Sequence, residues 1–164
     1  MTNPNPPAGG QPTSAVRAQT LPAQRLVNRV VRGLLRTPGV SGLVGKRMLT
    51  MYVVGRKSGR HYAIPLAYTR RDETLLVGTQ FAWVRNLRTG EPVDIRLAGK
   101  RRSADVQVVA DEAGVVELLA FMARDNHRFA KFNMIGFDQR GNPSSNDLHL
   151  AWAAGGRVAV LTPR

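Results

Sequence analysis

The sequence predicts a mostly β fold with flanking helices, of the α+β class, in which short strands form an antiparallel barrel. Three observations support this prediction. Short β-rich segments follow one another from residue 48 onward, tight turns separate them, and helical patterns lie before and after this run. The chain has 164 residues, 43% of them hydrophobic, which is enough for one domain with a substantial core.

The N-terminal region divides into two parts. Residues 1–20 hold four of the ten prolines together with many small polar residues, so we expect a disordered segment. Residues 21–164 are expected to form a single domain that begins with a basic amphipathic helix over 22–37. Its Leu and Val stripe either packs against the core or lies on an anionic membrane surface.

The remaining elements follow from β propensity, turn residues and helical periodicity. The strands expected first are Met48–Val54, Tyr62–Thr69, Thr74–Thr79, Val93–Ala98 and Ser103–Ala110. Asp111–Arg124 is expected to be a helix with Asp111 as its N-cap. We expect a long loop over 125–147, rich in Asn, Gly and Ser, and a last strand or two within Leu150–Leu161.

Positive charge is concentrated in the first part of the chain. Residues 1–71 contain twelve Lys and Arg and no Asp or Glu, whereas residues 72–164 contain twelve Lys and Arg and eleven Asp and Glu. The net charge of +13 therefore arises almost entirely from the first part. Such a patch attracts nucleic acid, an anionic membrane surface or a phosphorylated cofactor, and charge alone does not choose among them.

The composition argues against several kinds of chemistry. The chain has no cysteine, which excludes disulfides and a cysteine nucleophile, and its three histidines, His61, His127 and His149, lack metal-ligand spacing. No metal site is predicted. No apolar run has the length of a membrane-spanning helix and no secretory signal is visible, so we expect a cytoplasmic protein. Peripheral contact with the inner face of the cell membrane stays open through the helix over 22–37.

The most informative motif is the turn Gly55-Arg56-Lys57-Ser58-Gly59-Arg60 between two strand-like runs. It combines flexible backbone, three cations and one hydroxyl, which are the groups that hold a phosphate or carboxylate. A polar hairpin loop with no ligand would have the same composition. The motif therefore indicates a small anionic ligand without identifying it.

A longer pattern resembles a known family. The order LTxxxxGRKSGRxYxxPLAYxRxxxxLLVGT is followed by Trp83-Val84-Arg85-Asn86-Leu87-Arg88 and then by a Pro-Val-x-Ile-Arg strand. This order resembles the deazaflavin-dependent nitroreductase and quinone reductase family of actinobacteria, over roughly residues 25–115.

The resemblance implies a split β-barrel related to FMN-binding barrels, with reduced coenzyme F420, an 8-hydroxy-5-deazaflavin, as cofactor in preference to FMN. It implies an oxidoreductase that transfers a hydride to a quinone, nitro or enone acceptor. The cofactor's phosphate and acidic tail would meet Arg56, Lys57, Ser58 and Arg60. The ring would lie against Pro65, Leu66, Ala67, Val77, Gly78 and Thr79, where Gly78 would let a flat ring approach the backbone.

The resemblance also places Trp83 and Asn86 near the cofactor, and Trp83, Tyr68 and Phe81 are the candidates for the acceptor pocket. The chain lacks the Gly-Gly-x-x-x-His-Pro stretch that many members have before the tryptophan, and it has no tyrosine after Tyr68. Phe129, Phe132 and Phe137 are the nearest substitutes for the missing tyrosines. Acceptor preference therefore does not transfer, and no catalytic residue is assigned.

Two other functions stay open. The barrel could be a carrier that binds a deazaflavin, flavin or haem without turnover, or the basic residues of 17–60 could bind a membrane surface or nucleic acid. Nucleic acid is disfavoured because Tyr52 is the one aromatic among these basic residues that could stack on bases. The expected partners are the cofactor and an acceptor, with a homodimer by analogy of fold.

Overall fold

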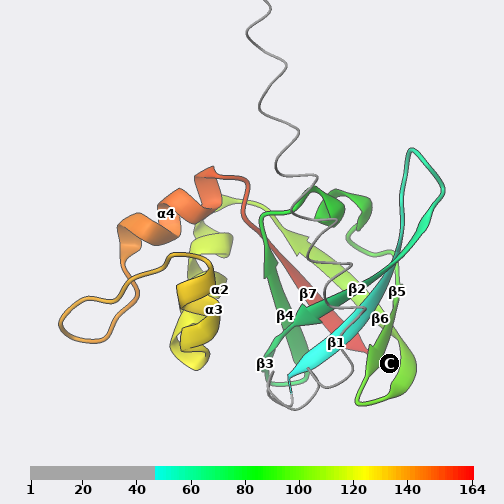
Figure 1. Cartoon of the computed structure of the whole chain (residues 1–164), viewed down its shortest axis with the longest axis horizontal. Coiled ribbons are helices and arrows are strands. Elements are labelled where there is room, and N and C mark those ends of the chain that lie inside the picture. Colours follow the sequence, from blue (N-terminus) through cyan, green and yellow to red (C-terminus); the bar gives the residue numbers. More distant parts are fainter. Residues whose placement is uncertain (1–46) are drawn as a thin grey trace, which may run out of the picture. The chain divides into compact units, whose positions relative to one another are not determined.

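The computed structural model describes residues 47–164. The segment 1–20 and the helix predicted over 22–37 lie outside the described residues. Figure 1 shows the elements, which in chain order are β1 (Met48–Val54), β2 (His61–Ala67), β3 (Thr69–Arg71), β4 (Thr74–Thr79), the 3-10 helix η2 (Ala82–Asn86), β5 (Val93–Leu97), β6 (Lys100–Val109), α2 (Glu112–Asp125), α3 (His127–Phe132), α4 (Ser145–Ala153) and β7 (Arg157–Pro163).

The seven described strands form one antiparallel sheet in the order β2-β1-β5-β6-β7-β4-β3. Its two edge strands, β2 and β3, are separated in the chain by a single residue, Tyr68. The sheet therefore has to curl until its edges meet at Tyr68, which makes a barrel that is closed there and split further along β2 (Figure 1). The predicted α+β fold with a split antiparallel barrel is confirmed.

The barrel interior is one of two apolar cores. On β1, side chains alternate, so that Leu49, Met51 and Val53 are buried inside the barrel, where they meet Ile95 and Leu161. This period of two is what a strand with one buried face requires. Trp83 of η2 packs against the same core from the split end, as does Leu87, the residue that follows η2.

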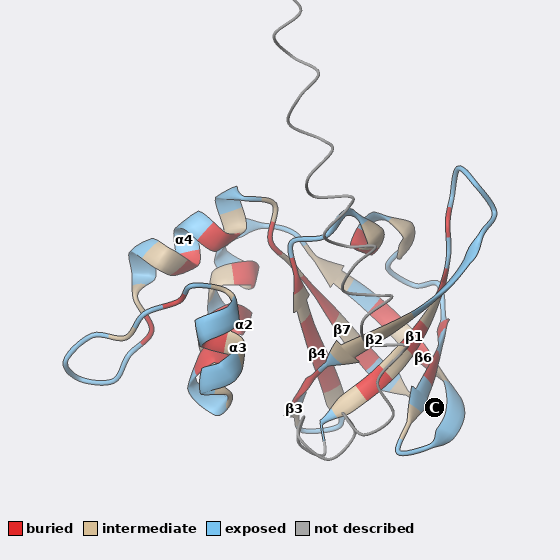
Figure 2. Ribbon diagram, viewed as in Figure 1, coloured by how far each residue is buried: buried red, intermediate tan, exposed pale blue. Residues whose placement is uncertain are grey.

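The second core lies outside the barrel, between β4 and β7 and the three α-helices (Figure 2). Leu76 and Val158 of the sheet are buried against Leu119 and Met122 of α2 and Leu148 of α4. The strand β4 is therefore buried on both faces, which explains its nearly continuous apolar sequence Thr74–Thr79.

Several predicted elements are confirmed. The strands β1 and β4 have the predicted bounds, and α2 begins after Asp111, whose carboxylate accepts a hydrogen bond from the Gly114 amide at 2.8 Å. The strand predicted over Tyr62–Thr69 is instead interrupted at Tyr68, where the chain passes from β2 to β3. Strand β6 begins at Lys100 rather than Ser103 because Ala98 and Gly99, both with positive φ, form a two-residue hairpin turn.

The long loop predicted over 125–147 is confirmed only for residues 133–144. Residues His127–Phe132 form α3, and α4 begins at Ser145 and continues to Ala153, into the segment predicted as strand. Asn126 and Ser144 cap these helices with side-chain hydrogen bonds to backbone amides. Polar residues that are typical of loops are also the best helix N-caps, and both helices are too short to show a clear apolar period.

Gly78 has a packing role that the sequence did not indicate. A Cβ at this position would lie 2.9 Å from Cζ of Phe129 and 3.1 Å from Cδ2 of Leu119. The missing side chain of Gly78 therefore leaves room for the aromatic ring of α3, on the outer face of β4. No helix in residues 47–164 is long and apolar enough to cross a membrane.

We expect Gly78→Ala to lower the free energy of unfolding by about 1 kcal/mol or more, because the new methyl group would overpack the contact with Phe129. Urea denaturation measures this change. The double variant Gly78→Ala with Phe129→Leu should lose less stability than the sum of the two single variants, because the smaller side chain relieves the overlap. A Gly78→Ala variant as stable as the wild type would contradict the packing described here.

Candidate functional site

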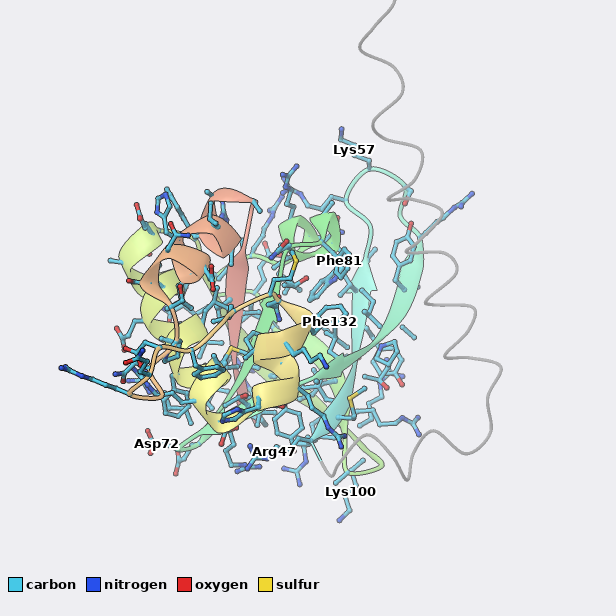
Figure 3. All side chains as sticks on the ribbon, turned by 60° about the vertical axis from the view of Figure 1, so that its left-hand side comes forward. Arg47, Lys57, Asp72, Phe81, Lys100 and Phe132 are labelled. Carbon is cyan, nitrogen blue, oxygen red and sulfur yellow. The ribbon has the colours of Figure 1, made fainter. Side chains whose placement is uncertain are left out.

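The basic turn is a well-defined hairpin connection between β1 and β2. The amide of Gly55 donates to the carbonyl of Arg60 at 2.8 Å, and the amide of Gly59 donates to the carbonyl of Gly55 at 2.7 Å. Gly59 has a φ of 62°, which favours glycine there. The side chains of Arg56, Lys57, Ser58 and Arg60 are all exposed. Figure 3 shows Lys57 at the tip of this hairpin.

Hydrogen bonds attach this turn to η2, which lies about 30 residues further along the chain. The amide of Arg56 donates to Oδ1 of Asn86 at 3.1 Å, and the Arg56 guanidinium donates to the carbonyl of Arg85 at 3.0 Å. Asn86 Nδ2 in turn donates to the carbonyl of Trp83 at 3.0 Å. One amide side chain thus fixes both the turn and the segment that carries the tryptophan.

A pocket of about 630 Å³ lies between the turn and the segment after η2. Arg56, Gly59 and His61 line it from the hairpin, and Asn86 and Arg88 line it from the other side.

The same pocket also has acidic lining residues that no motif in the sequence indicated. Glu91 pairs with Arg88 at 3.3 Å, and Asp94 pairs with Arg101 at 2.8 Å. These pairs neutralise two of the lining arginines. Arg56, by contrast, forms no ion pair within residues 47–164, so its positive charge remains available at the mouth of the pocket.

The segments predicted to meet the cofactor ring form the two edges of the split in the barrel. Residues 65–67 of β2 pair only with β1 among the described strands. Residues 77–79 of β4 lie beyond the end of β3 and pair only with β7 among them. Each segment therefore has one backbone edge without a strand partner. Pro65 is accommodated because an edge strand does not need its missing amide hydrogen.

The side chains of these segments make the split apolar. Val77 is fully buried in the barrel core, and Leu66 packs against the same core from β2. Thr79 is buried, and its hydroxyl accepts a hydrogen bond from the Phe81 amide at 3.1 Å. None of the six predicted ring-contact residues, Pro65, Leu66, Ala67, Val77, Gly78 and Thr79, lines the pocket beside the basic turn.

The three acceptor-pocket candidates are not brought together. Trp83 is partly buried against the barrel core, and Phe81, which precedes η2, is 44% exposed. Tyr68 instead lies at the closed end of the barrel, where it lines a different pocket with Lys100. Figure 3 shows Phe81 and Lys100 at opposite ends of the barrel.

The phenylalanines considered as substitutes for the missing tyrosines also separate. Phe129 covers Gly78 on the helical side of β4, and Phe137 stacks on His127 with ring centroids 4.8 Å apart. Phe132 is 76% exposed at the end of α3. Within residues 47–164, no group of three His, Asp or Glu side chains is arranged to hold a metal ion.

No protein-family model matches this chain, and no curated protein matches it. Among solved structures, it is similar to a pyridoxamine 5'-phosphate oxidase-related, FMN-binding protein from Nostoc punctiforme PCC 73102, with 16% identity and a TM-score of 0.49. That match covers 83% of this chain and 78% of the other. A second structure, described as a domain-swapped dimer, has 11% identity and a TM-score of 0.46, over 85% of this chain and 98% of the other. Both likenesses concern the fold only.

We expect Asn86→Ala to loosen the attachment of the basic turn to η2, because it removes both side-chain hydrogen bonds of Asn86 and leaves only the bond from Arg56 to the Arg85 carbonyl. The free energy of unfolding should fall by about 1–3 kcal/mol, and trypsin should cleave faster after Arg56, Lys57 and Arg60. Asn133→Ala is the matched control, since Asn133 donates to the carbonyl of Phe129 at 2.9 Å, on α3. Equal rates of turn cleavage in Asn86→Ala and the wild type would show that Asn86 does not hold the turn.

Proposed function

We propose that this protein is an oxidoreductase that binds a flavin-type cofactor, namely reduced coenzyme F420 in preference to FMN, and reduces a quinone, nitro or enone acceptor. The observation that carries the proposal is the attachment of the basic turn to η2 through Arg56 and Asn86. This attachment holds the basic turn against the segment that carries Trp83.

The turn fits an anionic group of the cofactor. Lys57 and Arg60 are exposed and form no ion pair within the described part of the chain, so both are available to a phosphate. The Arg56 guanidinium bonds to one carbonyl and keeps further N–H donors. The neighbouring pocket of about 630 Å³ lies within the usual range of ligand sites, about 300–1,000 Å³.

The split fits a flat heteroaromatic ring. The free backbone edges of 65–67 and 77–79 supply N–H and C=O groups for the polar atoms of such a ring. Leu66, which is partly buried against the barrel core, supplies apolar surface beside these edges. Because Gly78 faces Phe129, the ring would meet the edge of β4 rather than the space above Gly78.

When bound, the reduced deazaflavin supplies the hydride, so the protein has only to bind, orient and shield the reactants. Trp83, whose backbone carbonyl accepts a hydrogen bond from Asn86, packs against the barrel core at the split end. Phe81 offers an exposed aromatic surface next to it for an apolar acceptor. Tyr68 instead lines the pocket at the closed end.

Direct binding tests the proposal. A Trp152→Phe background leaves Trp83 as the single tryptophan of the chain, so quenching of its emission reports on the split end. We expect the deazaflavin to quench it and to bind more tightly than FMN. In that background, Lys57→Ala and Arg60→Ala should each weaken binding by about 1–3 kcal/mol, the contribution of a charge-assisted hydrogen bond.

Lys131→Ala, an exposed lysine on α3, is the control and should leave the affinity unchanged. Unaltered binding after loss of both Lys57 and Arg60 would remove the turn from the site. If the reduced cofactor binds but is not oxidised by quinones, nitro compounds or enones, the result would instead support the carrier function. A homodimer stays a prediction, as does contact with a membrane through the basic residues of 17–60, of which 17–46 lie outside the described residues.

A further inference from the structure

Two cations near the closed end of the barrel occupy positions where the strand register calls for apolar side chains. Arg102 on β6 is paired with Ile95, which is completely buried in the barrel core. Lys100 is paired with Leu97, which packs against the same core. Directly paired residues point to the same face of a sheet. Arg102 and Lys100 therefore project from the inner face of the barrel at this end.

A third cation reaches the same end of the barrel from the edge strand β3, and it also lies on the inner face of the sheet. Arg70 on β3 is paired with Leu75, another completely buried residue of the barrel core. It also follows Tyr68 by two residues, and Tyr68 belongs to that core. Its neighbour Arg71 points the other way, toward the helices, where it pairs with Glu117 at 3.2 Å.

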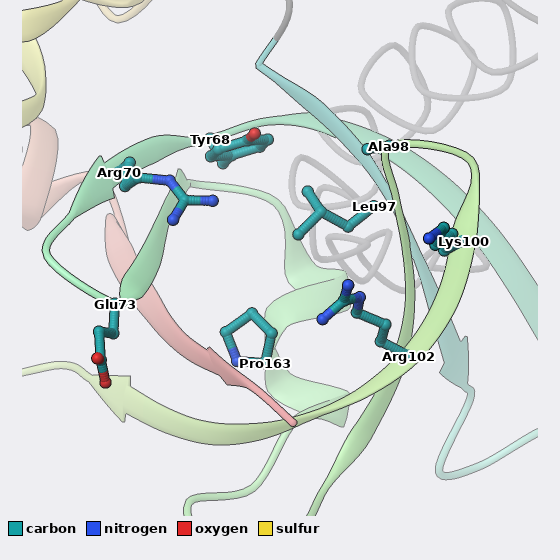
Figure 4. Close-up of a pocket in the computed structure, with 8 residues that line it drawn as sticks. All are labelled: Tyr68, Arg70, Glu73, Leu97, Ala98, Lys100, Arg102 and Pro163. Carbon is teal, nitrogen blue, oxygen red and sulfur yellow. The ribbon is translucent and has the colours of Figure 1, made fainter.

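These three side chains line a pocket of about 460 Å³ between the β3–β4 turn and the β5–β6 turn (Figure 4). Figure 4 shows the guanidinium groups of Arg70 and Arg102 pointing into the opening from opposite sides, with Lys100 at the rim. Leu97, Pro163 and the ring of Tyr68 supply an apolar wall. The pocket thus combines converging cations with an apolar surface.

The charge of this pocket is unbalanced within the described part of the chain. Arg70, Lys100 and Arg102 form no ion pair among residues 47–164, although five other arginines do. Glu73 is the one acidic residue of the lining, and its carboxylate points away from the opening in Figure 4. Three cations and one carboxylate leave a formal charge of +2. Three like charges around one opening repel one another unless an anion lies between them.

We propose that this end pocket binds a phosphate monoester, whose dianion matches the charge of +2, and that the apolar wall holds the organic group of the ester. Planar guanidinium groups suit phosphate because each presents two parallel N–H donors. The site is separate from the one beside the basic turn. The two pockets have no lining residue in common, and Lys57 and Lys100 mark opposite ends of the barrel in Figure 3.

The test uses phenyl phosphate as the probe, in isothermal titration calorimetry with the full chain. We expect Arg70→Gln combined with Arg102→Gln to weaken binding by about tenfold or more. Arg124→Gln combined with Lys131→Gln removes the same charge from the exposed faces of α2 and α3 and should change the affinity less than about twofold. Phenyl phosphate that does not bind at about 1 mM, or that binds equally to both double variants, would overturn the proposal.

Because the basic turn also attracts phosphate, the position of binding is measured on the wild type. In an amide NMR titration with phenyl phosphate, the backbone signals of Tyr68, Ala98 and Lys100 should shift. This readout does not depend on the folding of any variant. Shifts confined to residues 55–60 would overturn the proposal. Lys57→Ala, which is expected to weaken the deazaflavin site, should leave the shifts of Tyr68, Ala98 and Lys100 unchanged.

Two sources of the ester are distinguished by a second arm. Vesicles of phosphatidylcholine with phosphatidic acid present the same phosphate monoester on a lipid. A lipid headgroup would be identified if the wild type sediments with these vesicles and only one double variant loses this binding. That variant is Arg70→Gln with Arg102→Gln, whereas Arg124→Gln with Lys131→Gln should still sediment. Binding of phenyl phosphate without such sedimentation would identify a free ester, and both results support the pocket.

Discussion

The fold depends on the single residue between the two edge strands. In a flat sheet of seven strands, β2 and β3 would lie about 29 Å apart, since neighbouring strands are about 4.8 Å apart. One residue spans at most about 7 Å between its two neighbours. The link at Tyr68 therefore forces the sheet to curl into a barrel, and burial of the tyrosine, which is 8% exposed, holds the closure in place.

This constraint gives the barrel two different ends. At the end near Tyr68 the edges meet, and the hairpin turns around them place Arg70 and Arg102 over the closed interior. Beyond the short strand β3 the edges have no partner strand within the described chain, so the barrel is open between β2 and β4. The basic turn and η2 lie at that split end, attached by Asn86. An edge without strand partners is a site where backbone groups are available to a ligand.

Local signals in the sequence were sufficient for some elements. β propensity and turn residues predicted β1 and β4, and the Asp111 cap with an apolar period predicted α2. The turn that contains Lys57 was also predictable, because Gly and basic residues specify it locally.

Features that depend on distant contacts could not be predicted from local signals in the sequence. The register that puts Arg102 on the inner face, the fit of Phe129 against Gly78 and the bond from Arg56 to Asn86 each join segments that the sequence does not connect. Short helices such as α3 are stabilised mainly by packing, so their local pattern is weak.

The proposed cofactor site requires one ligand to contact both the basic turn and the free edge of β4 at the split end. Hydrogen–deuterium exchange of the full chain, with and without the reduced deazaflavin coenzyme, tests it most directly, because amides without a strand partner exchange quickly until a ligand covers them. We expect peptides covering residues 55–60 and 77–81 to become protected together, while the β5–β6 turn at the closed end does not change. Protection of the turn alone, or of neither segment, would contradict the claim that the split is the cofactor site.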